Sequence, residues 1–293
     1  MVVVTPSRFS LEGLVACGIP RARIAVVPHG VRSRPLGDAA SVHRARDAER
    51  GNRGWKSHFV LLHVGAATPN KNVATLIAAF RDALHTWSRV ATKQIKPRGG
   101  SKAANKGRPL LVLKGLDGLY GSGSAIRRAL DGAQLSAHEG PSLRGQEEVD
   151  VQIVGDPLSS LEMARLYAAS DGYVSASMAE AFQLPLAEAS AAGLPVIVPS
   201  GGAAEEVVDP ASAVFVDAVL KPRATDKGFL IQPERSSLTA AMLRVIHDKV
   251  VRERASGRGP LWVANRLSLS ASVDELLSVV TDPRYVGDTS TCS

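Results

Sequence analysis

Cysteine and aromatic residues are scarce in this chain of 293 residues, which has two cysteines and 4% aromatic residues. A structural disulfide is not expected, because Cys292 lies in a polar tail, and the low count is typical of a reducing compartment. No signal peptide is expected, because MVVVTPSRFS has no basic segment followed by a long apolar run. No apolar run reaches the roughly 18–20 residues that cross a bilayer. No Cys or His cluster has zinc spacing. These absences predict a cytoplasmic protein, for which peripheral membrane association stays open.

Acidic residues are missing from one segment, residues 89–108, which is rich in Gly, Ser and Lys. Its seven basic residues equal the whole net charge of +7, so the remaining chain is balanced. They are Arg89, Lys93, Lys96, Arg98, Lys102, Lys106 and Arg108. Such a run is typical of a solvated loop, and we interpret it as a basic insertion. The segment holds no aromatic residue on which a base could stack, so binding to nucleic acid is unlikely. A protein that binds RNA or anionic lipid is therefore the weakest alternative.

Short apolar runs alternate with amphipathic stretches along the chain. Several runs are nearly continuous Val, Ile and Leu, as expected for parallel strands that are buried on both faces. The predicted strands are 24–27, 59–64, 110–114, 149–154, 172–175, 195–199 and 213–216. This alternation predicts an α/β fold, a Rossmann-like parallel sheet with helices on both faces. Ligands of such folds bind beyond the carboxyl ends of the strands.

Capping signals mark several helices. Asn72 is a candidate N-cap for an amphipathic helix, and Ser159 with Glu162 forms a candidate capping box. Pro185 suits the first turn of a helix that Gly193 ends. Later helices are predicted over 236–250 and 273–280. Three segments are expected to be irregular: the charged residues 32–58, a polar loop at 134–148, and a glycine turn at 121–124.

The densest functional signal is residues 171–209, in which Glu180 and Glu188 are separated by seven residues. If a helix begins near Leu184, Glu180 lies on the loop before it and Glu188 lies near its first turn. The residues between them, Ala181, Phe182 and Gln183, would then present backbone N–H groups at a helix N-terminus, which is an anion site suited to a diphosphate. On spacing alone, two surface glutamates are the more common explanation.

In its context, SASMAEAFQLPLAEASAAGLPVIV resembles the motif of the retaining GT-B glycosyltransferases known as glycosyl transferases group 1. That motif is commonly written PS-x-x-E-G-F-G-L-P-x-x-E-A-x-A-x-G-x-P-V. LYAASDGYV and GGAAEEVV resemble neighbouring elements of the family, and FVLLHVGAATPNKNVATLIAAF resembles the first strand, phosphate loop and helix of its donor domain. TPSRFSLEGLVACGIPRARIAVVPHGV resembles the end of its acceptor domain and the crossing between the domains.

The resemblance implies roles for individual residues. Glu188 would bind the donor ribose, Glu180 would contact the transferred sugar, and Lys71 would bind the donor phosphates near Gly65. Lys71 and backbone N–H groups would stabilise the leaving diphosphate as an oxocarbenium-like transition state forms. Transfer would retain configuration without a metal, so no metal and no cofactor are expected besides the nucleoside diphosphate sugar. Asp156 lies where the family's base-contacting loop would fall.

The chain departs from the motif at four positions. Ala181 and Gln183 replace glycines that allow close backbone approach or positive φ, and their side chains would narrow the pocket. The second basic residue usual in the phosphate loop is replaced by Ala66 or Asn70, which would weaken diphosphate binding. Two histidines are not assigned to the site: His29 is expected in a turn and His63 in the core.

The resemblance also implies a division of the chain. Residues 1–31 would be the remnant of an acceptor domain that is otherwise missing, 32–58 a linker, 59–260 the donor domain, and 261–293 a C-terminal helix and polar tail. The expected function is a retaining glycosyltransferase, with an unknown glycan, lipid or protein acceptor, that needs a partner domain. The alternative is a catalytically silent nucleotide-sugar-binding subunit that works with a separate acceptor-domain chain.

Overall fold

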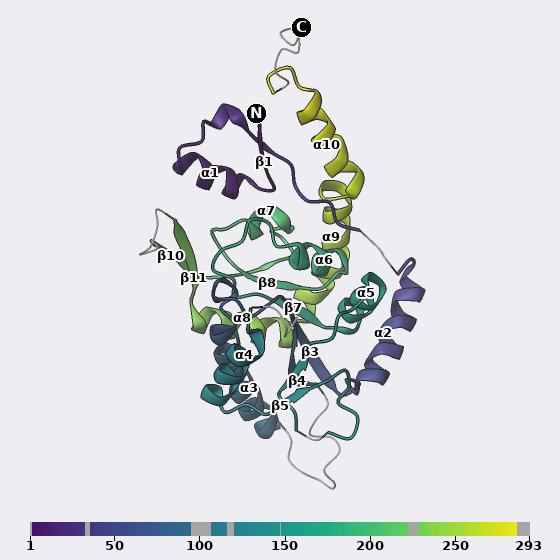
Figure 1. Ribbon diagram of the computed structural model, residues 1–293. Coiled ribbons are helices and arrows are strands. Elements are labelled where there is room, and N and C mark those ends of the chain that lie inside the picture. The colour runs from purple at the N-terminus through teal and green to yellow at the C-terminus, as the bar shows by residue number, and fades with distance from the viewer. Residues whose placement is uncertain are drawn as a thin grey trace.

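A central sheet of seven parallel strands organises the computed structural model (Figure 1). The structure describes residues 2–32, 36–94, 107–115, 120–146, 148–222 and 228–285. The strand order is β5-β6-β4-β3-β7-β8-β9. The strands are β3 (His58–Val64), β4 (Arg108–Lys114), β5 (Ala137–Glu139), β6 (Val151–Val154), β7 (Gly172–Val174), β8 (Val196–Pro199) and β9 (Val214–Val216).

Helices cover both faces of this sheet, which confirms the predicted α/β class. The strands form because alternate apolar residues serve two cores: Val60 and Leu62 of β3 pack into one, and Leu61 packs into the other. On the Leu61 side lie α3 (Val73–Gln94), α4 (Ser122–Ala133) and α8 (Arg235–His247). On the other side lie α2 (Ala39–Arg53), α5 (Ser160–Ala169), α6 (Leu184–Ala191) and α9 (Lys249–Arg266).

The capping signals place two helices correctly and one differently. Ser159 and Glu162 make both hydrogen bonds of a capping box at the start of α5. Helix α6 begins at Leu184 with Pro185 in its first turn, and Gly193, at φ +79°, follows its end. Asn72 adopts a left-handed φ of +52° before α3, and its side-chain oxygen accepts from the Thr75 hydroxyl at 2.8 Å instead of from a backbone N–H.

Residues 32–58, which are expected to be irregular, are largely helical, so that expectation is wrong, while their role as a linker stays a prediction. Helix α2 has a polar sequence and no apolar stripe of core width, so its periodicity gives little sign of packing. It docks against α5 through charge: Arg46 and Arg50 both bond to the carboxylate of Asp171. Asp171 also accepts from the Val60 backbone N–H at 2.8 Å, which ties α2 to the sheet.

Three further predictions need correction. The polar loop 134–148 contains the short edge strand β5, and the glycine turn at 121–124 runs into α4, which Gly121 precedes at φ +64°. The helix predicted over 236–250 is two helices, α8 and α9, and α9 continues through Pro260, across the expected domain boundary. Helix α3 extends into the basic insertion as far as Gln94. Residues 95–106 of that insertion and Cys292 lie outside the described residues.

The two ends of the described chain come together beside the main sheet, at the top of Figure 1. β1 (Val3–Thr5) and β2 (Ile24–Val26) form a separate two-stranded parallel sheet, with α1 (Arg8–Ala16) between them in sequence. Helix α10 (Leu269–Thr281) packs on β2, and Val31 bridges to Ser268. Among the described residues, every helix is too short or too polar to cross a bilayer.

The chain changes direction within the main sheet beside β3. From β3 it proceeds through β4 towards the β5 edge, and then returns to place β7 on the other side of β3. Such a reversal opens a crevice at the carboxyl ends of the two strands, where ligands of doubly wound sheets bind.

Candidate functional site

Two loops meet at this crevice, one after β3 and one after β7. The first carries Gly65 and Lys71, and the second carries Glu180. Hydrogen bonds join them directly: the Met178 N–H donates to the Asn70 carbonyl at 2.7 Å, and the Asn70 side-chain amide donates to the Ala179 carbonyl at 3.2 Å. The topology therefore brings together residues that the sequence separates by about a third of its length.

Lys71 and Glu180 form an ion pair across the two loops. Their side chains are only 19% and 16% exposed. In a shielded position each charge is stabilised mainly by the opposite charge beside it. Lys71 therefore needs Glu180 or another anion, and Glu180 needs Lys71 or another cation. The two residues to which the resemblance gives contacts with the transferred sugar and with the donor phosphates therefore lie at one point.

The loop before α6 has the backbone geometry that its usual glycines would allow. Gln183 adopts φ +75° although it is not glycine, a conformation that costs about 1–2 kcal/mol for an L-residue. Its side chain turns into the core, where its amide donates to Ser175 Oγ at 2.6 Å. Phe182 is buried as well. Neither side chain narrows a pocket, contrary to the expectation for Gln183, so only the backbone of these residues is available to a ligand. Ala181 and Leu184 are exposed.

Asn70 has a structural role in place of the missing second cation. Besides its bonds to the neighbouring loop, its side-chain oxygen accepts from the Thr68 hydroxyl at 2.7 Å. Asn70 therefore braces the phosphate loop without adding charge, and Lys71 remains the cation that faces Glu180.

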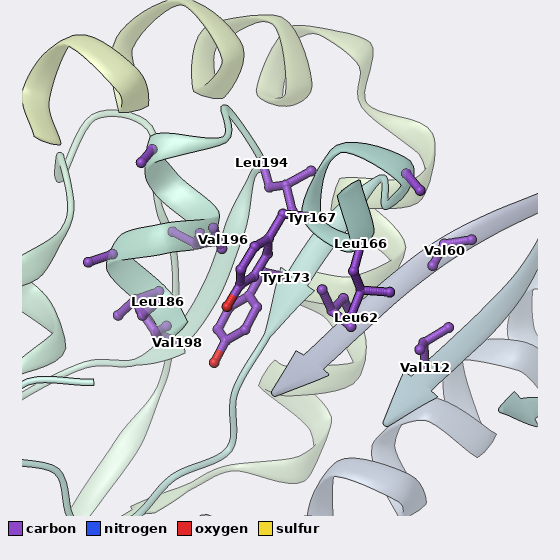
Figure 2. Packing of buried hydrophobic residues seen from close by; sticks show 14 of the residues in the cluster. Val60, Leu62, Val112, Leu166, Tyr167, Tyr173, Leu186, Leu194, Val196 and Val198 are labelled. Carbon is purple, nitrogen blue, oxygen red and sulfur yellow. The ribbon is translucent and has the colours of Figure 1, made fainter. Parts of the chain in front are cut away.

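Glu188 lies on α6 and has a different partner. The hydroxyl of Tyr167, on α5, donates to Glu188 Oε2 at 2.8 Å. Burial raises the pKa of Glu188 above its usual value, and the hydrogen bond from Tyr167 partly opposes the increase. Figure 2 shows Tyr167 beside Tyr173, with both hydroxyl oxygens pointing to the same side.

A groove of about 1500 Å³ borders Glu188. Its walls come from the start of α2, from α5, α6 and α9, and from the loop after β6. Leu158, Met163 and Leu184 supply apolar surface, and Glu188 and Tyr167 supply polar groups. Asp156 is exposed and does not line this groove, whereas Leu158, two residues later, does; a contact of Asp156 with a base stays a prediction.

His63 and Tyr173 lie beneath the crevice on β3 and β7. His63 is 2% exposed, as its expected place in the core requires. Its Nδ1 lies 3.0 Å from the Val174 carbonyl oxygen, so Nδ1 carries the proton. Burial lowers the pKa of His63 to about 4, which keeps the ring neutral. Tyr173 is fully buried. The sequence does not connect either residue with the site, because each lies within an apolar run that predicts a buried strand.

The N-terminal segment reaches the same loops. The Ser7 hydroxyl donates to the Ala181 carbonyl at 2.7 Å. The carboxylate of Glu206, on α7 (Ala204–Val207), accepts from the first backbone N–H groups of α1, with Arg8 at 2.9 Å and Phe9 at 2.8 Å. A carboxylate at this end of a helix is stabilised by the unpaired N–H groups there. His29 lies outside any helix or strand, after β2, and its ring packs edge-on against Phe182.

Solved structures of glycosyltransferases share this fold. HepE of Anabaena, in complex with UDP and glucose, superposes with a TM-score of 0.67 at 16% identity, over 96% of this chain and 63% of that one. A glycosyltransferase of Rickettsia africae gives 0.65 at 17%, over 95% and 62%. Sucrose-phosphate synthase of Thermosynechococcus elongatus gives 0.65 at 18%, over 95% and 57%. The chain thus spans less than two thirds of the length of these proteins.

Sequence comparison points the same way. No curated protein matches the sequence significantly. Residues 120–248, which contain both glutamates of the motif, match the family model of glycosyl transferases group 1. Residues 120–248 are therefore similar to the glycosyl transferases group 1 family, and nearly the whole chain shares the GT-B fold of the solved structures.

Proposed function

We propose that this chain carries the donor half of a retaining glycosyltransferase that uses a nucleoside diphosphate sugar. The observation that carries the proposal is the Lys71–Glu180 pair at the reversal point of the sheet, beside the N-terminus of α6. A cation and a helix N-terminus at one point suit a diphosphate, and a carboxylate next to them suits a sugar hydroxyl.

In this proposal the diphosphate binds Lys71 and the backbone N–H groups of residues 181–183. The charge that develops on the leaving diphosphate is then stabilised where it forms. Glu180, once separated from Lys71, contacts the transferred sugar near its reacting carbon. The bond between sugar and phosphate breaks through an oxocarbenium-like state, and its electron pair leaves with the diphosphate. The acceptor hydroxyl attacks from the face that the diphosphate leaves and gives its proton to the departing phosphate oxygen, which retains the configuration of the sugar.

The nucleoside is proposed to lie towards the groove at Glu188. The Glu188 carboxylate accepts hydrogen bonds from the ribose hydroxyls, while the Tyr167 hydroxyl donates to Oε2 of the same carboxylate. Leu158, Met163 and Leu184 offer apolar surface to a base.

The proposal keeps the division into a donor domain, 59–260, and a segment 1–31 that belongs with an acceptor domain. At the same end of the chain, Leu269, Val273 and Leu277 of α10 follow helical spacing and are about half exposed. The alternative, a silent nucleotide-sugar-binding subunit, is favoured by the single cation in the phosphate loop.

Calorimetric titration with UDP-, GDP- and ADP-sugars tests the donor site. We expect binding of at least one of them, and binding of none by the folded chain would refute the proposal. Donor hydrolysis, measured with the wild-type chain and with Glu180→Ala, separates the two functions. If the wild-type chain hydrolyses the donor and Glu180→Ala abolishes hydrolysis, the chain is an enzyme. If both chains bind the donor and neither hydrolyses it, the chain is the silent subunit.

The pH dependence of donor binding tests Glu188. Because ribose binding needs the carboxylate, affinity falls as the pH drops through the raised pKa of Glu188. Tyr167→Phe removes a contribution that lowers this pKa, so we expect the loss to begin at higher pH. Donor affinity measured from about pH 5 to about pH 8 checks this. The same raised pKa costs folding stability at neutral pH, and that cost disappears as Glu188 protonates.

Glu188→Gln is the control for this experiment. Its side chain cannot titrate, so adding Tyr167→Phe to Glu188→Gln should leave the pH dependence of donor affinity unchanged. If Tyr167→Phe shifts the pH dependence equally with and without Glu188→Gln, the pH dependence belongs to another group.

A further inference from the structure

Two buried polar atoms without a hydrogen-bond partner lie at the Lys71–Glu180 pair. They are His63 Nε2 and the Tyr173 hydroxyl, within the part of the chain that the structure describes. Their side chains are 2% and 0% exposed. Most buried polar atoms in folded proteins have a hydrogen-bond partner, so each one without a partner needs a physical explanation. The proposed roles of Lys71, Glu180 and Glu188 use neither atom.

The two residues occupy neighbouring strands at the end of the sheet where the site lies. Tyr173 is opposite Leu62, the residue before His63, in the register of β3 and β7. The hydrogen bond from His63 Nδ1 to the Val174 carbonyl fixes the ring and leaves Nε2 as an acceptor. Because strand side chains alternate between faces, the fold places the free acceptor and the free donor on opposite faces of the sheet, both beneath the two loops.

Each free atom lies near the charge that it could bind. A methyl group built on Gly65 would be 3.7 Å from His63 Nε2 and 3.6 Å from Lys71 Cε, so both atoms border the same point beside Gly65. The carboxylates of Glu180 and Glu188 act with burial to raise the pKa of Tyr173, so its hydroxyl keeps its proton. Figure 2 shows the Tyr173 hydroxyl on the same side as that of Tyr167, which binds Glu188.

We propose that His63 and Tyr173 are positioning residues that take over the two charges when a diphosphate separates Lys71 from Glu180. His63 Nε2 then accepts a hydrogen bond from the Lys71 ammonium, whose other protons bind phosphate. The Tyr173 hydroxyl donates to the Glu180 carboxylate and holds it for the sugar. This inference rests on the proposed function. It also explains why His63 Nε2 and the Tyr173 hydroxyl have no hydrogen-bond partner in the structure.

Tyr173→Phe tests the inference because it deletes one oxygen and keeps the ring. If the hydroxyl only packs, its removal leaves nucleotide affinity unchanged. If it holds Glu180 after the pair opens, the affinity for a nucleoside diphosphate falls about tenfold, as for a lost hydrogen bond to a charged group. The Tm without nucleotide should stay the same or rise, since an unpaired buried hydroxyl is removed. The probe is whichever of UDP, GDP and ADP binds the wild-type chain most tightly.

A double-mutant cycle with Glu180→Gln separates positioning from general packing. In the Glu180→Gln background no ion pair has to open, so Tyr173→Phe should then change the affinity by less than about twofold. Tyr285→Phe, which removes a hydroxyl far from the site, is the matched control and should bind like the wild-type chain. Equal affinity of Tyr173→Phe and the wild-type chain, or an equal loss in both backgrounds, would overturn the role of Tyr173.

His63→Leu and His63→Gln form the second arm. Leucine removes the acceptor and should weaken binding about tenfold, whereas glutamine offers an oxygen at a similar reach and should restore part of it. Failure of glutamine to bind better than leucine would overturn the role of His63. If the folded wild-type chain binds none of the nucleotides, the proposed function fails together with this inference; if it binds and the variants bind equally well, only the inference fails.

Discussion

Lys71→Ala is expected to reduce donor turnover on the order of 100- to 1000-fold, because under the proposed function it removes the cation that faces the developing charge of the leaving diphosphate. Donor affinity should fall by about tenfold or more, as for a lost hydrogen bond to a charged group. Calorimetry gives the affinity, and the rate of donor hydrolysis gives the turnover.

The ion pair complicates this experiment, and the complication supplies a control. Lys71→Ala leaves the Glu180 carboxylate shielded without its partner, so stability should fall as well. Adding Glu180→Ala removes the orphaned charge and should restore stability but not donor binding. Lys249→Ala, on an exposed helical pair, should change neither. Wild-type affinity in Lys71→Ala would remove the main support for the proposed donor site.

Asp171→Ala is expected to lower the free energy of unfolding by about 3 kcal/mol, since it leaves Arg46 and Arg50 without their shared carboxylate. Asp171 is only 15% exposed, and it also binds the Val60 N–H of the central strand. Urea unfolding measures the loss. Limited proteolysis should show earlier cleavage within α2, because that helix depends on the same contact.

Asp47→Ala is the matched control on α2. Its carboxylate pairs with His43 on an exposed part of the helix, and an exposed pair of this kind contributes about 0–1 kcal/mol. If Asp171→Ala unfolds at the same urea concentration as Asp47→Ala, the helix must be held by contacts other than these ion pairs.

Helices and strands that depend on local signals can be predicted from this sequence. Continuous runs of Val and Leu identify β3 and β4, Ser159 caps α5, and Pro185 marks the first turn of α6. Helix α2 escapes prediction for a physical reason. It is held by guanidinium groups that reach one distant carboxylate, and no periodicity within residues 39–53 reveals that partner.

The site is predictable as a set of residues but not as a set of contacts. The resemblance identifies Lys71 and Glu180 one at a time and does not predict that they touch. Their contact joins positions 109 residues apart and depends on which strands become neighbours. Gln183 shows a second limit. Its long side chain suggests a blocked pocket, but the positive φ of its backbone turns that side chain into the core. The unpaired hydroxyl of Tyr173 becomes visible only once all of its neighbours are in place.

The Ala181 carbonyl, which accepts from the Ser7 hydroxyl, connects the loop before α6 to a second part of the molecule. One side of the peptide chain faces the proposed anion site, and the other side is bound to the N-terminal segment. A ligand that shifts this loop must alter the free energy with which residues 7–10 are held. By thermodynamic reciprocity, a partner that moves those residues must alter the affinity for the ligand by the same factor. Hydrogen bonds from Ser7 and Ser10 to one carbonyl thereby make occupancy at one end of the molecule detectable at the other.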